Sequence, residues 1–420
     1  MTDTDATFVV VGASLAGAKA VEALREAGFA GRVVLIGAET ERPYERPPLS
    51  KGYLTGKEPA DKAYVHPEGW YAEHDIDLRL GTVVTAVDRT AREVVLADGG
   101  RVRFDKLLLT TGSSVVKLKV PGADLDGVRY LRTFDDSTYL KNALPDAGQV
   151  AVIGGGWIGL EVASAARGYG ASVVLIEPQR APLHAVLGAE LGEFFAQVHR
   201  DHGVDVRLGV GVAELRGGSG DGGGGGDSGR VDTVVTTDGL EVPADLVVVG
   251  VGVKPNVELA AAAGLLVDDG VVVDEFLRST DPDIYAAGDI ANAHNPWLGR
   301  QIRVQHWANA LDQGSAAARS MLGFDEPYAK VPYFFSDQYD IGMEYSGFAP
   351  PGAYDQVVYR GDPASREFCA FWLAEDRIMA GMNVNVWNVH PTIRALIKSG
   401  ARVDVQRLTD PSAPLDAVKA

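Results

Sequence analysis

The stretch "TFVVVGASLAGAKAVEALREAG", residues 7–28, decides the fold. An apolar strand runs directly into glycines and then into a segment whose apolar residues recur at helical spacing. Gly12, Ser14 and Gly17 occupy the three positions of a GxGxxG pattern, with serine in the middle. The first glycine makes the tight turn and the third lets helix and strand pack closely, which directs the free N–H groups of the helix N-terminus at a pyrophosphate. The stretch therefore predicts a Rossmann-like dinucleotide-binding fold.

An acidic residue follows at the expected distance. The second strand, "RVVLIGAE", ends in Glu39, roughly 20 residues after the glycines, where a carboxylate would accept hydrogen bonds from ribose hydroxyls. A glycine pattern alone is a weak signal. Strand, glycines, helix, second strand and acid in this order indicate a nucleotide site much more strongly.

The same pattern recurs at residues 149–178, "QVAVIGGGWIGLEVASAARGYGASVVLIEP". Gly154, Gly156 and Gly159 form the second fingerprint, and Glu177 ends the following strand. A carboxylate there favours the free 2′-hydroxyl of NADH because it repels the 2′-phosphate of NADPH, although Arg180 is near enough in sequence to weaken that preference. Two complete fingerprints predict two dinucleotides, which disfavours a dehydrogenase with a single cofactor.

The segments that follow the two fingerprints are also alike. Short strands at 82–114 reach Thr111 and Gly112, and an equivalent passage, "VDTVVTTDGLEVPADLVVVGVGVKPN", follows the second fingerprint. This duplication predicts an internal repeat. The second copy contains "GGSGDGGGGGDSG", Gly217 to Gly229, which cannot bury apolar surface and is interpreted as a hairpin loop without a function.

Composition excludes several classes of protein. A chain of 420 residues with 46% hydrophobic residues predicts two or three globular domains. No apolar run approaches the roughly 20 residues of a membrane span, and the acidic start "MTDTDATFVVVG" lacks a secretory signal, so we expect a cytoplasmic protein. The net charge of −18 argues against nucleic-acid binding.

Cysteine usage excludes an intramolecular disulfide and any metal or thiol redox site built on a CxxC pair. Cys369 is the only cysteine, so neither an intramolecular disulfide nor a CxxC site can form. It lies in the alternating run "EFCAFWL", which predicts a small buried residue of a strand. We predict no metal site.

Two further stretches place polar residues near helix starts. In "ERPPLSKGYL", residues 45–54, the prolines suit the start of a helix and Lys51 could simply be solvated. In "STDPDIYAAGDIANA", residues 279–293, a strand ending at Gly288 and Asp289 ahead of a helix would put a carboxylate where a ribityl chain could donate hydrogen bonds to it. The simpler alternative for Asp289 is a helix cap.

With these motifs the sequence resembles the FAD-containing, NADH-using ferredoxin reductases of the putidaredoxin reductase type, within the glutathione-reductase fold group. The resemblance covers nearly the whole chain and is carried by the motifs "GASLAG", "ERPPLSKGYL", "LLLTTG", "RYLRT", "GGGWIGLEVA", "VGVKPN", "AAGDIAN", "QHWANALDQG", "YFFSDQYDIGMEY" and "MNVNVW". It implies that FAD binds at the first fingerprint and NADH at the second. Hydride then passes from NADH to flavin N5, and single electrons pass to a ferredoxin that serves a cytochrome monooxygenase or a ring-hydroxylating oxygenase.

The resemblance also implies cofactor-binding residues beyond the fingerprint glycines. For FAD these are Ala16, Glu39, Arg46, Lys51, Val84, Arg132, Asp289 and Trp307, and for NADH they are Trp157, Ile158, Glu161 and Glu177. The remaining cofactor-binding residues that we expect are Leu15, Thr111, Gly112, Gly252, Gly288, Gln305, His306 and Phe335.

Three residues are the expected catalytic group. By resemblance, Pro47 packs beside the isoalloxazine ring, and Lys51 approaches flavin N5 and pairs with Glu161. A cation there would stabilise negative charge on the reduced flavin. The disulfide reductases of the same fold group hold a redox-active cysteine in this region, and this chain has none.

The chain departs from its relatives at two positions. Relatives often have glutamate and tryptophan where this chain has Gln305 and Phe335. Phe335 can still stack on a nicotinamide, with a smaller face. Gln305 removes a charge near the flavin, so the flavin potential and the nicotinamide affinity of relatives do not transfer directly.

The partner implied by the resemblance is an acidic iron–sulfur ferredoxin. In "VHPTIRALIKSGARVD", residues 389–404, Arg394 and Lys398 share a helical face, and Arg402 lies just beyond the stop at Gly400. Our hypothesis is that this basic patch docks the ferredoxin in a small, transient interface. The alternative is a solvated helix face.

The predicted fold class is α/β, with two Rossmann-like dinucleotide-binding domains (FAD and NAD) of the glutathione-reductase type and a C-terminal α+β domain. The expected boundaries are 1–115 and 250–325 for the FAD domain, 116–249 for the NADH domain and 326–420 for the last. Rival functions are rubredoxin reductase, a nitrite reductase component, an NADH oxidase or peroxidase, and an NADH-responsive flavoprotein of the apoptosis-inducing-factor type. The oxidases normally need a redox cysteine, and the nitrite reductases usually carry extra cluster-binding cysteines.

Overall fold

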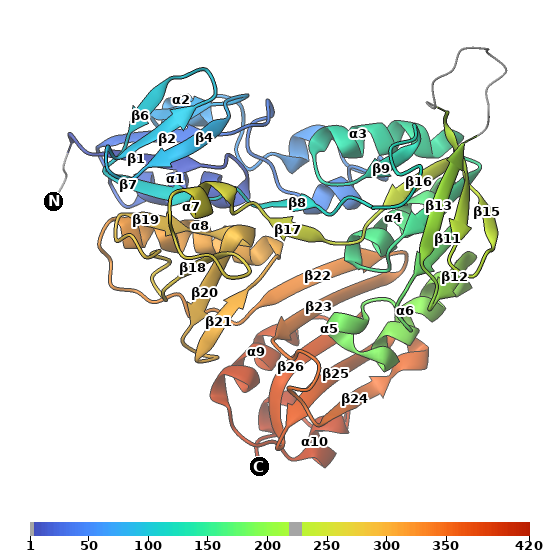
Figure 1. Cartoon of the computed structure of the whole chain (residues 1–420). Coiled ribbons are helices and arrows are strands. Elements are labelled where there is room, and N and C mark those ends of the chain that lie inside the picture. The colour runs from blue at the N-terminus through green and yellow to red at the C-terminus, as the bar shows by residue number, and fades with distance from the viewer. Residues whose placement is uncertain (1–3, 218–228) are drawn as a thin grey trace. The chain divides into compact units, whose positions relative to one another are not determined.

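The computed structural model describes residues 4–217 and 229–420, and these divide into two compact units of chain (Figure 1). Among these residues, the first unit comprises 4–47, 60–114 and 254–334, and the second comprises 48–59, 115–217, 229–253 and 335–420. The predicted glycine-rich hairpin loop lies outside the described residues, apart from Gly217 and Gly229 at its ends.

The first unit is built on a five-stranded parallel sheet of order β19-β7-β1-β2-β3. Its central strands are apolar on both faces because helices and a further sheet cover them, and Val9, Val34 and Leu107 are fully buried. The strands are β1 (Thr7–Val11), β2 (Arg32–Ile36), β3 (Ile76–Arg79), β7 (Lys106–Leu109) and β19 (Ile284–Ala286).

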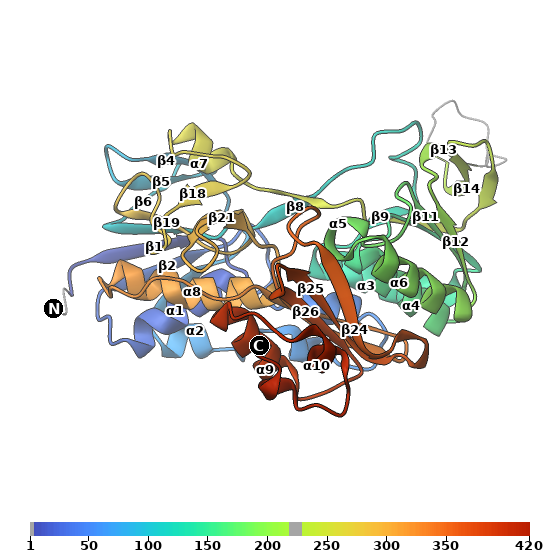
Figure 2. The ribbon, with the colours of Figure 1, turned by 90° about the horizontal axis from the view of Figure 1, so that it is seen from below.

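Two long helices of the first unit, α1 (Leu15–Glu26) and α8 (Trp307–Met321), pack against each other (Figures 1 and 2). The stretch "WANALDQGSAAARSML", whose apolar residues recur at helical spacing, forms α8. The shorter helices of the first unit are α2 (Trp70–Glu73), α7 (Glu258–Ala262) and the 3-10 turns Ala60–Ala63 and Gly288–Ile290. Its smaller sheets are β4 (Val84–Asp88), β5 (Glu93–Leu96) and β6 (Arg101–Arg103), and β18 (Val271–Val273), β20 (Ala291–Asn295) and β21 (Arg300–Arg303).

The second unit repeats this plan. Its parallel sheet has the order β12-β11-β10-β16-β9, in which the first four strands match β3-β2-β1-β7. The edge strands differ along the chain, because β9 precedes β10 whereas β19 follows β7. Each parallel sheet is accompanied by a three-stranded antiparallel sheet. The predicted internal repeat is thus present in the topology. The strands are β9 (Val128–Tyr130), β10 (Gln149–Ile153), β11 (Ser172–Glu177), β12 (Val204–Leu208), β13 (Val212–Gly217), β14 (Val231–Thr236), β15 (Glu241–Pro243) and β16 (Leu246–Val249).

The helices of this half are α3 (Phe134–Ala143), α4 (Trp157–Gly168), α5 (His184–Leu187) and α6 (Ala189–Asp201), with 3-10 turns at Pro47–Ser50 and Leu144–Asp146. β8 (Ser113–Val115) and β17 (Val253–Pro255) form a two-stranded ribbon.

A five-stranded sheet of order β22-β23-β26-β25-β24 forms the C-terminal part of the second unit. Helix α9 (His390–Ser399) packs on β23 and β26, and α10 (Val405–Thr409) packs on β24 (Figure 2). Cys369 is buried in β25, as its alternating context predicts. The strands are β22 (Tyr333–Gln338), β23 (Ile341–Gly347), β24 (Gln356–Asp362), β25 (Glu367–Ala374) and β26 (Arg377–Val384), with 3-10 turns at Pro363–Ser365 and Leu415–Ala417.

One predicted element is wrong. A helix was expected after Gly288 and Asp289, but the chain makes only the 3-10 turn Gly288–Ile290 and continues as strand β20. The reason is tertiary: β20 finds hydrogen-bonding partners on both sides, parallel to β18 and antiparallel to β21. Across the described part of the chain, every helix is too short or too polar to span a membrane.

Candidate functional site

The first fingerprint forms the turn between β1 and α1. Gly12 has φ +120°, and a Cβ atom there would lie 2.1 Å from the carbonyl oxygen of Thr110. A Cβ on Gly17 would lie 2.1 Å from the carbonyl oxygen of Gly12, so both positions require glycine. Ser14 precedes α1 without a side-chain cap, and the first turn, with Leu15 and Ala16 buried, carries no acidic residue. The free N–H groups of this helix end are therefore suited to an anion.

Residues from several loops of the first unit gather round Glu39. The hydroxyl of Tyr44 donates to Glu39 Oε2 at 2.5 Å, and Arg46 Nη2 lies 3.3 Å from Oε1. The backbone N–H of Gly81 donates to the carbonyl of Glu39, which brings the start of β4 at Val84 into the same region. The Glu39 side chain stays 41% exposed, so its carboxylate can still accept hydrogen bonds from a ribose.

The turn at Gly288 and Asp289 lies against the start of α1. A Cβ on Gly288 would lie 3.3 Å from Ala16 Cβ, and the Gly288 N–H donates to Gln313 Oε1 at 2.9 Å. Burial lowers the pKa of His306 to about 4, against an opposing effect of the Asp289 carboxylate, so His306 is neutral near pH 7. The sequence-predicted residues Ala16, Gly288, Asp289 and His306 therefore share one region of the first unit.

Gln305 and Trp307 flank His306 at the start of α8. Trp307 Nε1 donates to Glu45 Oε2 at 3.1 Å, and the His306 ring stacks on Phe334 with 4.4 Å between ring centroids. Among the described residues, the buried Gln305 Nε2 has no hydrogen-bond partner. A buried amide donor of this kind costs free energy unless a bound group accepts from it.

The loop after β7 holds Thr111 and Gly112 in place through Asn256. Thr111 Oγ1 donates to the Asn256 carbonyl, and Asn256 Nδ2 donates to the Thr111 carbonyl, both at 2.8 Å. Gly112 has φ +65°. In the second unit, Arg132 lies just before α3, and its N–H donates to Asp136 Oδ2 at 3.0 Å.

The second fingerprint has the geometry of the first. Gly154 has φ +104°, and a Cβ on Gly159 would lie 2.0 Å from the carbonyl oxygen of Gly154. Gly156 differs, because the nearest atom to its Cβ would be 3.9 Å away, in Gly250. The space at Gly156 is thus left open by the protein, which fits the close approach of a pyrophosphate.

Glu177 ends β11 beside this loop. Its Oε2 accepts from the Gly155 N–H at 2.6 Å and its Oε1 accepts from the Gln179 N–H at 2.7 Å. Each carboxylate oxygen can accept a further hydrogen bond, so the group can both shape the loop and bind a ribose.

Two more residues predicted for NADH lie at the start of α4, and Gly252, predicted to bind a cofactor, lies just after β16. Trp157 and Ile158 begin α4, where the Ile158 side chain is 43% exposed although apolar. Gly252 has φ +111° and open space at its Cβ position.

Lys51 and Glu161 form a buried ion pair in the second unit. Lys51 follows the 3-10 turn Pro47–Ser50, which Pro47 begins, and Glu161 lies one turn into α4. Lys51 Nζ is 2.5 Å from Glu161 Oε1, and the two side chains are 17% and 3% exposed. Lys51 Nζ also lies 5.2 Å from the centre of the Phe335 ring. The structure therefore brings three of the sequence-predicted residues together.

Two serines at this pair were missed by the sequence reasoning. Ser50 Oγ donates to Glu161 Oε2 at 2.5 Å, and Ser336 Oγ donates to Glu161 Oε1 at 2.6 Å. Ser336 stands in the quoted motif "YFFSDQYDIGMEY", and Ser50 in "ERPPLSKGYL", so the motifs contained both. A serine hydroxyl has no sequence pattern that singles it out within them.

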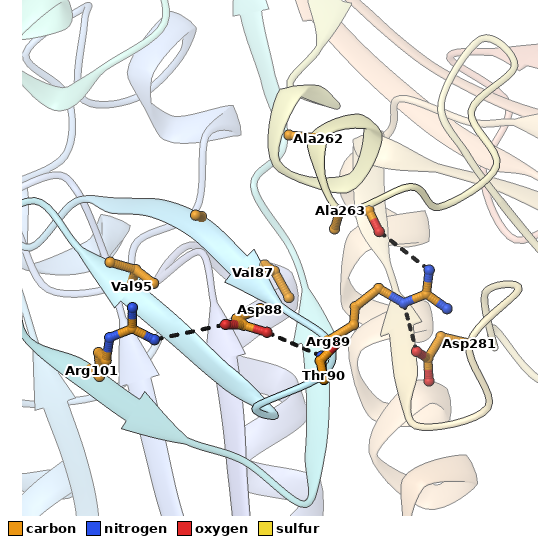
Figure 3. A pocket seen from close by; sticks show the side chains of 10 residues that line it. Val87, Asp88, Arg89, Thr90, Val95, Arg101, Ala262, Ala263 and Asp281 are labelled. Carbon is orange, nitrogen blue, oxygen red and sulfur yellow. Dashed lines mark hydrogen bonds and ion pairs between the residues drawn. The ribbon is translucent and has the colours of Figure 1, made fainter.

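A surface pocket of about 730 Å³ in the first unit is separate from the predicted cofactor-binding and catalytic residues (Figure 3). Arg89 Nε binds Asp281 at 2.8 Å, and Arg101 binds Glu93 at 2.9 Å and Asp88 at 3.8 Å. Because carboxylates already neutralise both guanidinium groups, the pocket offers no unpaired charge to an anionic ligand. None of the predicted site residues lines it.

Comparison with known proteins identifies the family. Residues 6–314 match the family model "Pyridine nucleotide-disulphide oxidoreductase", and residues 333–419 match "Reductase C-terminal". The chain is 41% identical to the anthranilate 1,2-dioxygenase system ferredoxin–NAD(+) reductase component of Burkholderia cepacia, over 97% of this chain and 98% of that protein. It is 36% identical to putidaredoxin reductase of Pseudomonas putida, over 98% and 96%.

A solved structure shows the same fold. The reductase in the crystal structure of the covalent putidaredoxin reductase–putidaredoxin complex matches with a TM-score of 0.93 and 36% identity, over 98% of both chains. The predicted resemblance, fold class and pair of cofactors, FAD and NAD(H), are thereby confirmed. The glycine cradles and the orphaned Gln305 amide fit such cofactors. The chain belongs to the pyridine nucleotide-disulphide oxidoreductase family, and its last part is a reductase C-terminal domain.

Proposed function

We propose that the protein is an FAD-containing ferredoxin reductase that takes hydride from NADH and passes single electrons to a ferredoxin serving an oxygenase. The observation that carries this proposal is the combination of two dinucleotide-binding halves with the absence of a reactive thiol from the whole sequence. Burial raises the pKa of the Cys369 thiol to about 11, so the only cysteine stays protonated and cannot relay electrons. The relatives named as ferredoxin–NAD(+) reductases support the same acceptor.

The residues of the two fingerprints have separate tasks in this proposal. Those around Gly12, Glu39 and Asp289 would hold FAD, and those around Gly156 and Glu177 would hold NADH. The proposed FAD domain comprises 1–115 and 250–325, the NADH domain 116–249, and the C-terminal domain 326–420. Bound FAD supplies the conversion of a two-electron donor into single electrons. The protein's part is to position the cofactors and to place the Lys51 cation where negative charge develops. A cytoplasmic location stays a prediction.

Glu177 should set the preference for NADH over NADPH. Replacing it with alanine removes the carboxylate that would repel a 2′-phosphate and leaves the exposed Arg180 nearby, so the ratio of kcat/KM for NADH to that for NADPH should fall about tenfold or more. Glu177→Gln is the informative companion, because its amide keeps an acceptor for the loop N–H groups. Steady-state kinetics with both coenzymes measure the ratio, and an unchanged ratio in both variants contradicts the assignment.

For the partner we propose a docking surface on α9. Its buried face consists of Ile393, Leu396 and Ile397. The half-buried Arg394 and the exposed Lys398 lie outside that face, with no ion pair to either among the described residues. Trp387, 56% exposed, precedes the helix by three residues. An exposed aromatic beside unpaired cations is typical of an interaction surface, and the cations would attract an acidic ferredoxin to a protein whose net charge is −18.

Charge reversal tests this surface. Arg394→Glu with Lys398→Glu should raise KM for ferredoxin about tenfold at low salt, because complementary charges mainly increase the association rate. Reduction of a small neutral dye by NADH should stay unchanged, since the dye needs no docking. Equal losses with ferredoxin and dye reject the surface, and Arg278→Glu, which alters an exposed arginine of the first unit, is the control.

The proposed function itself is tested by NADH-dependent turnover with a panel of acceptors. Purified holoprotein with NADH should reduce cytochrome c only when a ferredoxin is added. Turnover with rubredoxin but with no ferredoxin would instead make the protein a rubredoxin reductase. Stable charge-transfer complexes with slow turnover would indicate a redox-responsive binding protein.

A further inference from the structure

A chain of hydrogen bonds runs from the Glu161 carboxylate through buried residues of the second unit. Ser336 Oγ donates to Glu161 Oε1 at 2.6 Å, and Gln338 Nε2 donates to Ser336 Oγ at 3.1 Å. His199 Nε2 lies 3.0 Å from Gln338 Oε1. We propose that Ser336, Gln338 and His199 are positioning residues that fix the Glu161 carboxylate against Lys51 and so set how fast the protein accepts hydride from NADH.

The bonds of this chain all run in one direction. Burial lowers the pKa of His199 to about 4, so its ring is neutral near pH 7 and carries one donor and one acceptor nitrogen. The Gln338 amide nitrogen already donates to Ser336, so its oxygen must accept from His199 Nε2–H. Nδ1 then accepts from the Tyr339 hydroxyl, 3.2 Å away. Every donor of the chain therefore points toward Glu161 Oε1.

Each member of the chain is carried by a regular element. Glu161 lies on α4 and His199 lies on α6. Ser336 and Gln338 are two residues apart on β22, so the side chains of these two residues point to the same face of the strand. All four residues are at most 3% exposed. A buried polar network whose members are all hydrogen-bonded holds its side chains in one arrangement.

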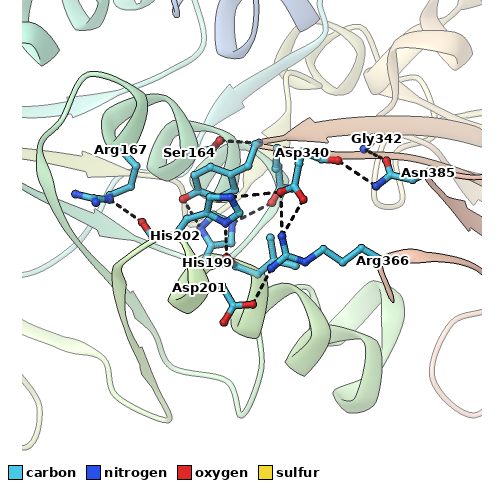
Figure 4. A network of polar contacts seen from close by, with 12 residues as sticks. Ser164, Arg167, His199, Asp201, His202, Asp340, Gly342, Arg366 and Asn385 are labelled. Atoms are coloured by element: carbon cyan, nitrogen blue, oxygen red, sulfur yellow. Dashed lines mark hydrogen bonds and ion pairs between the residues drawn. The ribbon is translucent and has the colours of Figure 1, made fainter. Parts of the chain in front are cut away.

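The outer end of the chain is held by charged residues nearer the surface (Figure 4). The Tyr339 ring stacks on His202 with 3.8 Å between ring centroids, and His202 Nε2 lies 3.3 Å from Asp340 Oδ1. Asp340 also binds Arg366 at 2.9 Å, and the Tyr339 N–H donates to Ser164 on α4 at 3.0 Å. The turn after β22 is thereby tied to both helices.

The role of the chain is orientation and not proton conduction. Gln338 has no ionisable proton, so a proton cannot pass along the chain by exchange. Glu161 Oε1 accepts from both Lys51 and Ser336, while Oε2 accepts from Ser50. Loss of the Ser336 hydroxyl removes one of the two hydrogen bonds at the oxygen that faces Lys51, so the carboxylate can turn about its remaining bond to Ser50 and displace the ammonium group. The purely structural alternative is that these bonds only join α4, α6 and β22.

Stopped-flow reduction of the holoprotein by NADH distinguishes the two roles. Ser336→Ala should lower the limiting rate of flavin reduction about tenfold, because a hydrogen bond to a charged group is lost, and should leave the apparent Kd for NADH unchanged. Ser336→Thr should restore most of the rate because it keeps a hydroxyl. Tyr339→Phe, three hydrogen bonds further from Glu161, should lower the rate about twofold at most.

The matched control is Ser346→Ala on β23. Its hydroxyl is also buried, but it has no hydrogen-bond partner among the described residues, so its removal should leave the rate unchanged. Equal limiting rates for Ser336→Ala and Ser346→Ala overturn the inference, as does a Ser336→Thr variant no faster than Ser336→Ala. The inference rests on the proposed function. A wild-type flavin that NADH fails to reduce overturns that function, and the inference with it, before any variant is compared.

Discussion

Replacing Lys51 with methionine should lower the rate of flavin reduction by NADH about a hundredfold or more, and should also destabilise the protein by about 3 kcal/mol. The rate falls because the variant lacks the cation that would stabilise negative charge on the reduced cofactor. The stability falls because Glu161, only 3% exposed, would remain as a buried carboxylate without its counter-ion 2.5 Å away. Stopped-flow absorbance and thermal unfolding of the holoprotein measure the two effects separately.

A double variant separates the catalytic effect from the structural one. Lys51→Met with Glu161→Gln removes both charges, so most of the stability should return while the rate stays low. The control is Lys254→Met, which breaks an exposed pair with Glu258 and should change neither quantity appreciably. Recovery of the rate in the double variant, or an unchanged rate in Lys51→Met, would show that the cation has no catalytic role.

Replacing Gly156 with alanine should give a protein that keeps FAD and its stability but binds NADH at least about tenfold more weakly. The fold tolerates the added methyl group because the nearest protein atom would be 3.9 Å from it. The ligand should not, because the middle glycine of the fingerprint lets the backbone approach the pyrophosphate. The measurements are KM for NADH, the flavin content of the purified protein and the unfolding temperature.

Two glycines of α4, the helix that follows Gly156, complete the test. Gly159→Ala should destabilise the protein, because its Cβ would lie 2.0 Å from the Gly154 carbonyl oxygen, and Gly168→Ala should be harmless, because no atom lies within 4 Å of its Cβ position. An unchanged KM in Gly156→Ala would place the dinucleotide elsewhere. A loss of stability like that of Gly159→Ala would show that the fold, and not the ligand, requires glycine at residue 156.

The fingerprints could be predicted because their constraints are local. At Gly12 and Gly154 the turn needs a positive φ. At Gly17 and Gly159 an added Cβ atom would lie about 2 Å from a carbonyl oxygen of the preceding turn, so the glycine spacing alone indicates the structure. The internal repeat could be predicted for the same reason, since the order of strands and glycines recurs along the chain.

What the sequence did not reveal depends on contacts between distant residues. Ser50 and Ser336 meet Glu161 from 111 and 175 positions away, and Glu45 meets Trp307 from 262 positions away. The segment after Gly288 is a strand and not the predicted helix, because it pairs with β18 and β21, and its own residues do not indicate these partners.

The central claim is that electrons pass from NADH to a bound flavin and on to an iron–sulfur acceptor without a protein thiol. An anaerobic titration of the holoprotein with NADH, followed by oxidised ferredoxin, tests it most directly, with the Cys369→Ser variant in parallel. We predict that one equivalent of NADH bleaches the flavin and that two equivalents of ferredoxin restore its colour, equally in both proteins. A flavin that NADH leaves oxidised, or a reduced flavin that ferredoxin cannot reoxidise, would contradict the account.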